Sequence, residues 1–165
     1  HQASSKLKVF RMAYGSGGAD KSISPEDVYN AFESMIEKDG KVTQDWDHAL
    51  DLRLLELDMF ERPDGFAKIM ICGFLLAMDC LPKGGTLSFT CKDPGEYVIT
   101  ATGEDCGPKH EMEEALNHEI AQDALQPKHI HAHVTTLLCQ HYGYTLAVHE
   151  KSESSTSFLF TIPRP

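Results

Sequence analysis

The sequence lacks several features that would mark particular classes of protein. Its 165 residues include 25 Asp and Glu against 15 Lys and Arg, which gives a formal net charge of −10. Such a surface repels nucleic-acid phosphates and anionic lipids, so neither a nucleic acid nor a membrane is an expected partner. The longest apolar run, residues 69–78, is too short to cross a bilayer, and we expect no secretory leader.

The sequence also lacks a CxxC pair among its five cysteines. The five are Cys72, Cys80, Cys91, Cys106 and Cys139. An odd, scattered set predicts neither a disulfide framework nor a zinc ribbon, and it fits a reducing cytoplasm. Cys106 lies between Asp105 and Gly107, where a nearby acid disfavours the reactive thiolate, so we expect this thiol to be inert.

What the chain does have is clear helix and strand patterning. Residues 4–14 predict a helix with Leu7, Phe10 and Tyr14 on one stripe, and the glycines of 15–18 break it. We interpret residues 1–14 as the last turns of a helix from a preceding module.

The next helix has a recognisable start. Ser24 is the predicted N-cap, Pro25 takes the first helical position, and Asp27 lies in the first turn, where the helix dipole favours negative charge. Asp39-Gly40 is the predicted stop, and residues 41–47 alternate like a strand.

The remaining elements complete a mixed pattern. Residues 66–81 are apolar nearly all round and predict a buried helix, whereas 50–60 fit a helix or an extended segment equally well. Further along the chain we predict strands at 86–92 and 96–102, helices at 111–119 and 128–142, and strands at 144–149 and 157–162. The predicted fold class is α+β: a two-layer sandwich with a mixed sheet and helices on one face.

Residues 68–89 resemble the ATP-binding domain of histidine kinases. In that family a buried helix with an Asn-Ala pair precedes a Pro-x-Gly-Gly turn and a strand, and here Ala77, Pro82, Gly84 and Gly85 match. The last helix, Gly143 and the closing strand also match. The resemblance covers about residues 24–163 and implies the histidine-kinase ATPase (Bergerat) type of sandwich.

The departures from the family concern the nucleotide. Leu76 stands where working kinases hold magnesium with an asparagine, and leucine has no oxygen for a hard cation. The glycine-rich phosphate loop is not found. Asp105 and Gly107 resemble the first part of the family's adenine-reading Asp-x-Gly-x-Gly, but Lys109 replaces the second glycine. Such short motifs also arise by chance, so an adenine contact and an ordinary loop both stay open. The resemblance implies a degenerate nucleotide pocket at these positions and no cofactor.

Within this superfamily the pattern is most similar to the ChpT-type histidine phosphotransferases. Residues 6–15 resemble the end of that family's second dimerisation helix, and Leu125-Gln126-Pro127 before the last helix also fits. The resemblance implies a dimerisation-helix end plus linker at 1–19 and a degenerate ATPase-like domain at 20–165. It places the phospho-histidine on a helix upstream of this chain, so no catalytic residue is expected here.

The same resemblance implies the partners. They are receiver domains of response regulators and of a hybrid kinase, with the intact protein a homodimer through the missing helices. Phe10 and Tyr14 are the expected contacts. The intact protein resembles a transferase, and this chain alone is expected to be inactive. The alternatives are a divergent but working ATP-binding domain of a sensor kinase, and a purely structural domain.

Nine histidines raise the question of a metal. The densest group falls on one predicted helix: His129, His131, His133, Cys139 and His141. The spacing is loose, so we expect no metal and interpret these residues as helix polarity, with His133 or His141 at the edge of the core. His110-Glu111 and His118-Glu119 weakly resemble phosphoryl carriers, and we interpret them as surface residues.

Overall fold

The structure is a computed structural model that describes residues 2–15, 23–36, 41–46, 63–108, 110–117 and 126–163. Its elements are α1 (Gln2–Tyr14), α2 (Pro25–Ile36), β1 (Val42–Gln44), α4 (Phe66–Asp79), β2 (Gly85–Asp93), β3 (Glu96–Thr102), α5 (His110–Leu116), α6 (Pro127–Tyr142), β4 (Thr145–Lys151) and β5 (Ser155–Thr161). The predicted order of helices and strands is confirmed. The predictions for residues 16–18, 39–40, 50–60, Lys109 and 118–119 lie outside the described residues.

The strands form one mixed sheet in the order β1-β2-β3-β5-β4. β1 runs parallel to β2, and the other neighbours are antiparallel. Successive side chains of a strand point to opposite faces. On one face, the inward residues of β2, β3 and β5 are at most 1% exposed: Leu87, Phe89, Tyr97, Ile99, Phe158 and Phe160. Residues between them, such as Ser88 and Thr100, are half-buried.

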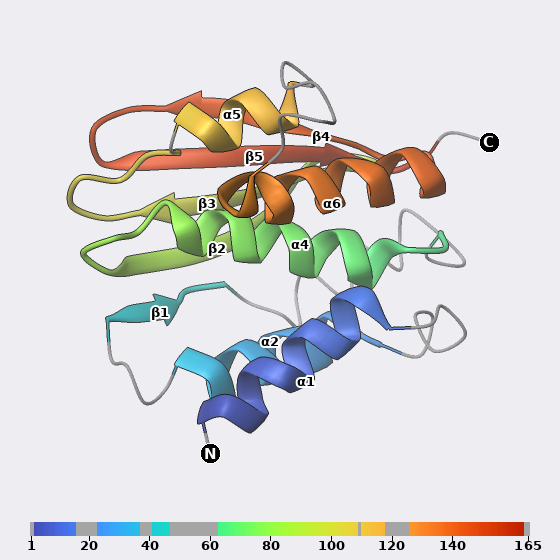
Figure 1. Ribbon diagram of the computed structural model, residues 1–165, viewed down its shortest axis with the longest axis horizontal. Helices are drawn as coiled ribbons and strands as arrows, with labels where there is room; N and C mark the ends of the chain where they lie inside the picture. Colours follow the sequence, from blue (N-terminus) through green and yellow to red (C-terminus); the bar gives the residue numbers. More distant parts are fainter. Residues whose placement is uncertain are drawn as a thin grey trace.

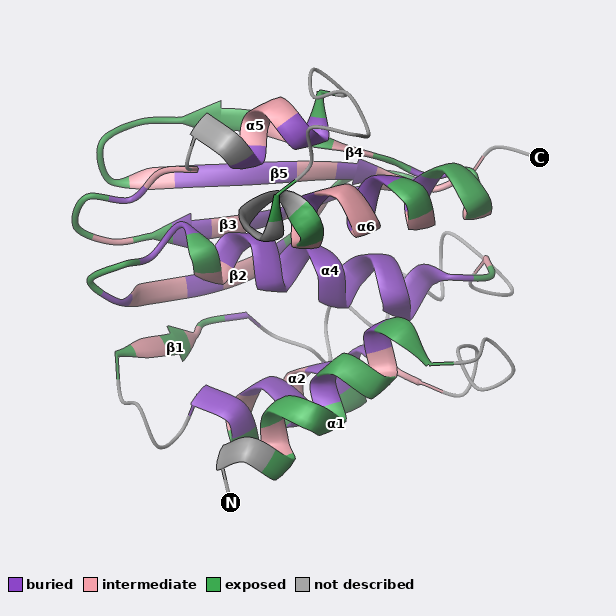
Figure 2. Ribbon diagram, in the orientation of Figure 1, coloured by how far each residue is buried: buried purple, intermediate pink, exposed green. Residues whose placement is uncertain are grey.

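α4, α5 and α6 lie in front of the sheet in Figure 1, and α1 and α2 are seen below β1. α4 is the central helix, and it contacts β2, β3 and β5 as well as α1, α2 and α6. Every residue from Phe66 to Ala77 is buried, which Figure 2 shows as an almost continuous buried ribbon. The predicted fold class and the predicted buried helix are therefore confirmed.

Aromatic side chains fill the space between α4 and the sheet. Phe74 lies 5.4 Å from Phe32 and 5.6 Å from Trp46, measured between ring centroids. Trp46 follows β1, which is shorter than the predicted strand of 41–47. The indole also packs on Phe89, with 5.4 Å between the centroids. The Asp45 amide donates to the Leu87 carbonyl at 2.8 Å, so the contact with β2 continues one residue past the end of β1.

The sequence predicted the start of α2 and the turn after α4, and local contacts account for both. The Ser24 hydroxyl accepts a hydrogen bond from the Asp27 amide at 3.1 Å, and the Asp27 carboxylate accepts one from the Ser24 amide at 2.9 Å. This reciprocal pair caps α2 as a capping box. After α4, Gly85 has a φ of 144°, and a Cβ there would overlap the carbonyl oxygen of Thr102. The second glycine of the Pro-x-Gly-Gly turn is thus required by the close approach of β2 and β3.

α1 packs against α2 and α4 through its small and branched residues. Val9 is 1% exposed and Ala13 is fully buried. The buried ammonium of Lys68, on the first turn of α4, donates to the carbonyl oxygens of Ala13 at 3.4 Å and Gly15 at 2.6 Å. These are carbonyls at the end of α1, where a helix leaves its acceptors unpaired. These hydrogen bonds therefore connect the C-terminal end of α1 to α4.

The apolar residues of α6 differ in burial. Ile130 is 50% exposed and Leu137 is 48% exposed, whereas Leu138 is partly buried against the core. Thr135 and Thr136 face inward instead. Their hydroxyls donate to the carbonyls of His131 at 2.9 Å and His133 at 2.7 Å, so burying them leaves no hydroxyl unpaired.

Candidate functional site

The degenerate nucleotide positions gather around the C-terminal half of α4. Leu76 is 1% exposed, and one turn earlier Gly73 approaches Ile99 of β3 so closely that a Cβ would have to displace it. The carbonyl of Leu76 accepts a hydrogen bond from the thiol of Cys80 at 3.4 Å. Leu76 therefore presents only hydrocarbon at a position where magnesium coordination would need an oxygen.

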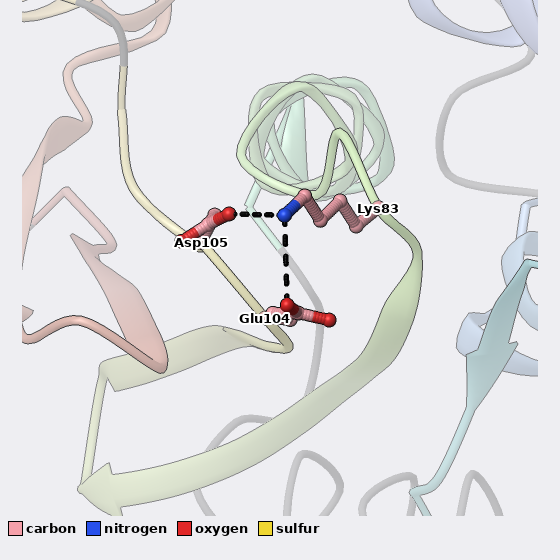
Figure 3. Close-up of polar contacts among 3 residues, drawn as sticks. All are labelled: Lys83, Glu104 and Asp105. Carbon is pink, nitrogen blue, oxygen red and sulfur yellow. Dashed lines mark hydrogen bonds and ion pairs between the residues drawn. The ribbon is translucent and has the colours of Figure 1, made fainter.

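Asp105 lies in the loop between β3 and α5, in the left-handed region with a φ of 53°. Its carboxylate is 2.5 Å from the ammonium of Lys83, and Glu104 lies 3.5 Å from the same ammonium. Figure 3 shows Lys83 reaching from the turn after α4 to both acids. The hydrogen bond and charge of Asp105, with help from Glu104, raise the pKa of Lys83. The Asp105 carboxylate thus faces a cation at the surface.

Hydrogen bonds from Gly107 and Cys106 connect this loop to the end of α4 and to β3. The amide of Gly107 donates to the carbonyl of Cys80 at 3.1 Å. The thiol of Cys106 donates to the carbonyl of Ala101 at 3.3 Å and is buried. A Cβ on Gly107 would meet no atom within 4 Å, so this geometry does not require glycine there. The structure brings Asp105 and Gly107 beside the end of the helix that carries Leu76.

Phe10 and Tyr14 lie on the outer surface of α1. Phe10 is 39% exposed, Tyr14 is 40% exposed, and their rings are stacked with centroids 6.2 Å apart. The hydroxyl of Tyr14 is 3.4 Å from Nδ1 of His131 on α6, and the two rings meet edge to face. No sequence pattern predicted this contact between residues 117 positions apart.

The histidine group of α6 is spread over different surroundings. His131 is half-buried against Tyr14, and burial lowers its pKa despite the opposing charge of Asp79. His141 is exposed and packs edge to face on Tyr142, 4.6 Å between centroids. His133 is half-buried. Among the described residues no three His, Cys, Asp or Glu side chains gather as a metal site. The side chains of His110 and His129 lie outside the described residues.

The thiols near α4 are poor nucleophiles and poor metal ligands as they stand. Burial raises the pKa of Cys72 to about 11, and it raises the pKa values of Cys80 and Cys139 to about 12. A thiol with such a pKa is protonated at neutral pH, whereas the thiolate is the reactive form.

Two depressions mark the described surface. One, of 270 Å³, lies between α5, α6 and β4 and includes Thr135, Cys139 and Tyr144. The other, of 180 Å³, lies beside Phe10 and His131. Neither is lined by Leu76, Asp105 or Gly107. None of the described helices combines the length and apolarity that crossing a bilayer demands.

The mixed sheet with helices on one face defines the class: a two-layer α+β sandwich. Residues 25–154 match the family described as histidine phosphotransferase C-terminal domain. The chain belongs to this family, and the membership indicates a role in a phosphorelay with response regulators as the class of partner. No curated protein matches the chain.

One solved structure shares this fold, and two others have lower similarity. A bacterial phosphotransferase, 17% identical, superposes with a TM-score of 0.70 over 96% of this chain and 72% of its own. The mycobacterial sensor histidine kinase MprB is 18% identical, with a TM-score of 0.44 over 85% of this chain and 95% of its own. Full-length ShkA in complex with AMPPNP is 14% identical, with a TM-score of 0.46 over 98% of this chain and 35% of its own. Of the three, the first defines the shared fold.

Proposed function

We propose that this chain is the pseudo-ATPase domain of a histidine phosphotransferase in a bacterial two-component phosphorelay. The domain binds no ATP and helps to dock receiver domains. The phospho-histidine lies on a helix upstream of this chain, in a dimerisation module whose second helix ends in residues 1–19. The chain alone is inactive, because it has the docking surface without the phosphoryl carrier.

The observation that best supports the absence of ATP binding is the burial of Leu76, which is 1% exposed within the hydrophobic core. Placing a hydrated magnesium ion there would require an oxygen ligand and room for water, and a packed leucine supplies neither. The ion pair of Asp105 with Lys83 supports the same proposal, since a carboxylate already facing an ammonium 2.5 Å away is less available to an adenine amino group.

The family supports the proposed partners. Receiver domains of response regulators, and of the hybrid kinase that feeds the relay, approach the phospho-histidine of the intact homodimer. Phe10 and Tyr14 are the proposed contacts, because their end of α1 would be the part of this chain nearest to the upstream helix that carries the histidine. The relay operates in the cytoplasm, and the five cysteines, all free thiols, fit a reducing compartment.

Isothermal titration calorimetry of the folded chain with ATP and magnesium tests the pseudo-ATPase proposal, with a working sensor-kinase domain as the positive control. We expect no binding heat up to millimolar nucleotide. A micromolar dissociation constant would overturn the proposal and identify a working ATP-binding domain instead.

A further inference from the structure

The C-terminal end of α1 is held to the domain at two polar points. At the first, the Lys68 ammonium donates to the carbonyl oxygens of Ala13 and Gly15. At the second, the hydroxyl of Tyr14 lies 3.4 Å from Nδ1 of His131 on α6, and the two rings meet edge to face with their centroids 6.2 Å apart. Histidine is the side chain whose charge ordinarily changes between about pH 5 and 8, so the second point is the one that can respond to mild acid.

The surroundings of His131 favour the neutral imidazole. Nε2 is buried and has no hydrogen-bond partner among the described residues. A neutral ring can meet the Tyr14 hydroxyl through Nδ1 and leave Nε2 as a bare acceptor, whereas the imidazolium places a charged N–H at Nε2. A buried charged donor without a partner is costly. Burial accordingly lowers the pKa of His131, although the charge of Asp79 opposes the shift.

The described charged and titratable groups around this ring belong to α1 and α4. Lys6 and Asp79 line the same depression of 180 Å³ as His131, and their charges act on an imidazolium in opposite directions. Cys72 of α4 interacts with Tyr14, and burial raises the pKa of both the Tyr14 phenol and the Cys72 thiol, so neither loses its proton near neutral pH. α2 contributes an uncharged side chain to the depression. His131 is therefore the member of this group that titrates in mild acid.

We propose that His131 acts as a pH-sensitive switch in the attachment of α1. The neutral ring holds the last turn of α1 against α6, and protonation loosens this contact while the hydrogen bonds of Lys68 persist. The effect is local, because α1 also packs on α2 and α4 through buried residues such as Val9 and Ala13. Protonation therefore opens the seam between α1 and α6 and leaves the core closed.

The switch needs only contacts within this chain, whereas its consequence rests on the proposed function. Under that function α1 is the end of a dimerisation helix, so loosening its last turn would let the ATPase-like domain change its orientation relative to the phospho-histidine. A failure of the switch leaves the proposed function untouched, and the absence of phosphotransfer leaves the switch untouched.

The experiment uses the full-length protein and follows amide hydrogen exchange in residues 11–14, the last turn of α1, at about pH 7.5 and 5.5. Exchange is expressed as protection factors, which remove the intrinsic effect of pH. The variants are His131→Gln, which keeps a polar side chain without the titration, and Asp79→Asn, which removes the anion that favours the imidazolium. The matched control is His141→Gln, at an exposed histidine of the same helix.

We expect these amides to exchange faster than those of α4 at both pH values, and their protection to fall by about three- to tenfold at the lower pH. The upper limit holds because a histidine with the ordinary pKa of 6.5 in the loosened state favours protonation by a factor of about ten at about pH 5.5. His131→Gln should abolish the fall, Asp79→Asn should keep or enlarge it, and the control should keep it.

Three results would each overturn the switch. The first is an equal fall in His131→Gln, which would assign the pH dependence to another group. The second is a smaller fall in Asp79→Asn, which would contradict the electrostatic argument. The third is exchange of the α1 amides as slow as that of α4 at both pH values, because α1 would then not loosen separately from the domain.

Discussion

Replacing Lys68 by methionine should release α1 from the domain. Lys68 is 4% exposed, and its ammonium donates to the carbonyls of Ala13 and Gly15. Methionine keeps most of the apolar stem and removes the charge, so packing around the stem should change little. The variant therefore separates the hydrogen bonds at the end of α1 from the hydrophobic contacts of Val9 and Ala13.

The size of the effect follows from the geometry. The bond to Gly15 is short at 2.6 Å and should contribute most, since a hydrogen bond from a charged donor is worth about 1.5–3 kcal/mol. The bond to Ala13 is long at 3.4 Å and adds little. Methionine also avoids the cost of burying an ammonium, which offsets part of the loss. We expect a net loss of about 1–2 kcal/mol.

The loss should be local, because a helix of 13 residues is marginal without tertiary contacts. Amide hydrogen exchange in α1 should accelerate roughly tenfold or more, while exchange in α4 and β3 stays near its original rate. Lys92→Met, at an exposed lysine of β2, is the matched control and should change the unfolding free energy by less than about 0.5 kcal/mol. If the amides of α1 exchange as slowly in the Lys68 variant as in the wild type, and the unfolding free energy in urea is unchanged, then the Lys68 hydrogen bonds do not hold α1 to the domain.

Two further predictions concern the turn after α4 and the contact of α6. Gly85→Ala should lower the unfolding free energy by more than about 3 kcal/mol or prevent folding, because its Cβ would overlap the Thr102 carbonyl. Gly107→Ala should change the unfolding free energy by less than about 0.5 kcal/mol, because its Cβ would meet no atom within 4 Å. Thermal unfolding of both variants tests this contrast, and equal melting temperatures would contradict it. Burial lowers the pKa of His131 below its ordinary value of 6.5, so the unfolded chain binds this proton more readily and the unfolding free energy should fall as the pH drops through that value. Urea titrations at about pH 7.5 and 5.5 should show a smaller fall for His131→Gln, and an identical fall in both proteins would exclude the histidine as a source.

The fold was predictable from local signals that the tertiary structure reinforces. The Ser24 capping box, the all-round apolar helix of α4 and the Pro-x-Gly-Gly turn each specify an element through its own chemistry. α6 was predicted as a helix, but its buried face was not. Ile130 and Leu137 are exposed although they are apolar, and Thr135 and Thr136 are buried with their hydroxyls bonded to carbonyls of the same helix.

The candidate site was predictable in part. Leu76 was identified by its place in a motif, and its burial matches the hydrocarbon character of the residue. The ion pair of Asp105 with Lys83 could not be foreseen, because it joins a turn and a loop that only the folded sheet brings together. The contact of Tyr14 with His131 depends in the same way on how α1 crosses α4. Whether residues 1–19 belong to a dimerisation module stays a prediction.

The edges of the sheet limit how a partner can be recognised. β1 has three residues, and β4 is interrupted by a register shift between Val148 and Glu150 and ends in the charged pair Glu150-Lys151. Short, charged or bulged edges resist the addition of a further strand. A regulator that approached along the sheet would find few backbone groups in register, so growth of the sheet into a larger assembly is disfavoured. A partner of this domain would then be recognised through side-chain contacts, so that a few surface substitutions would change which partner binds without affecting the fold.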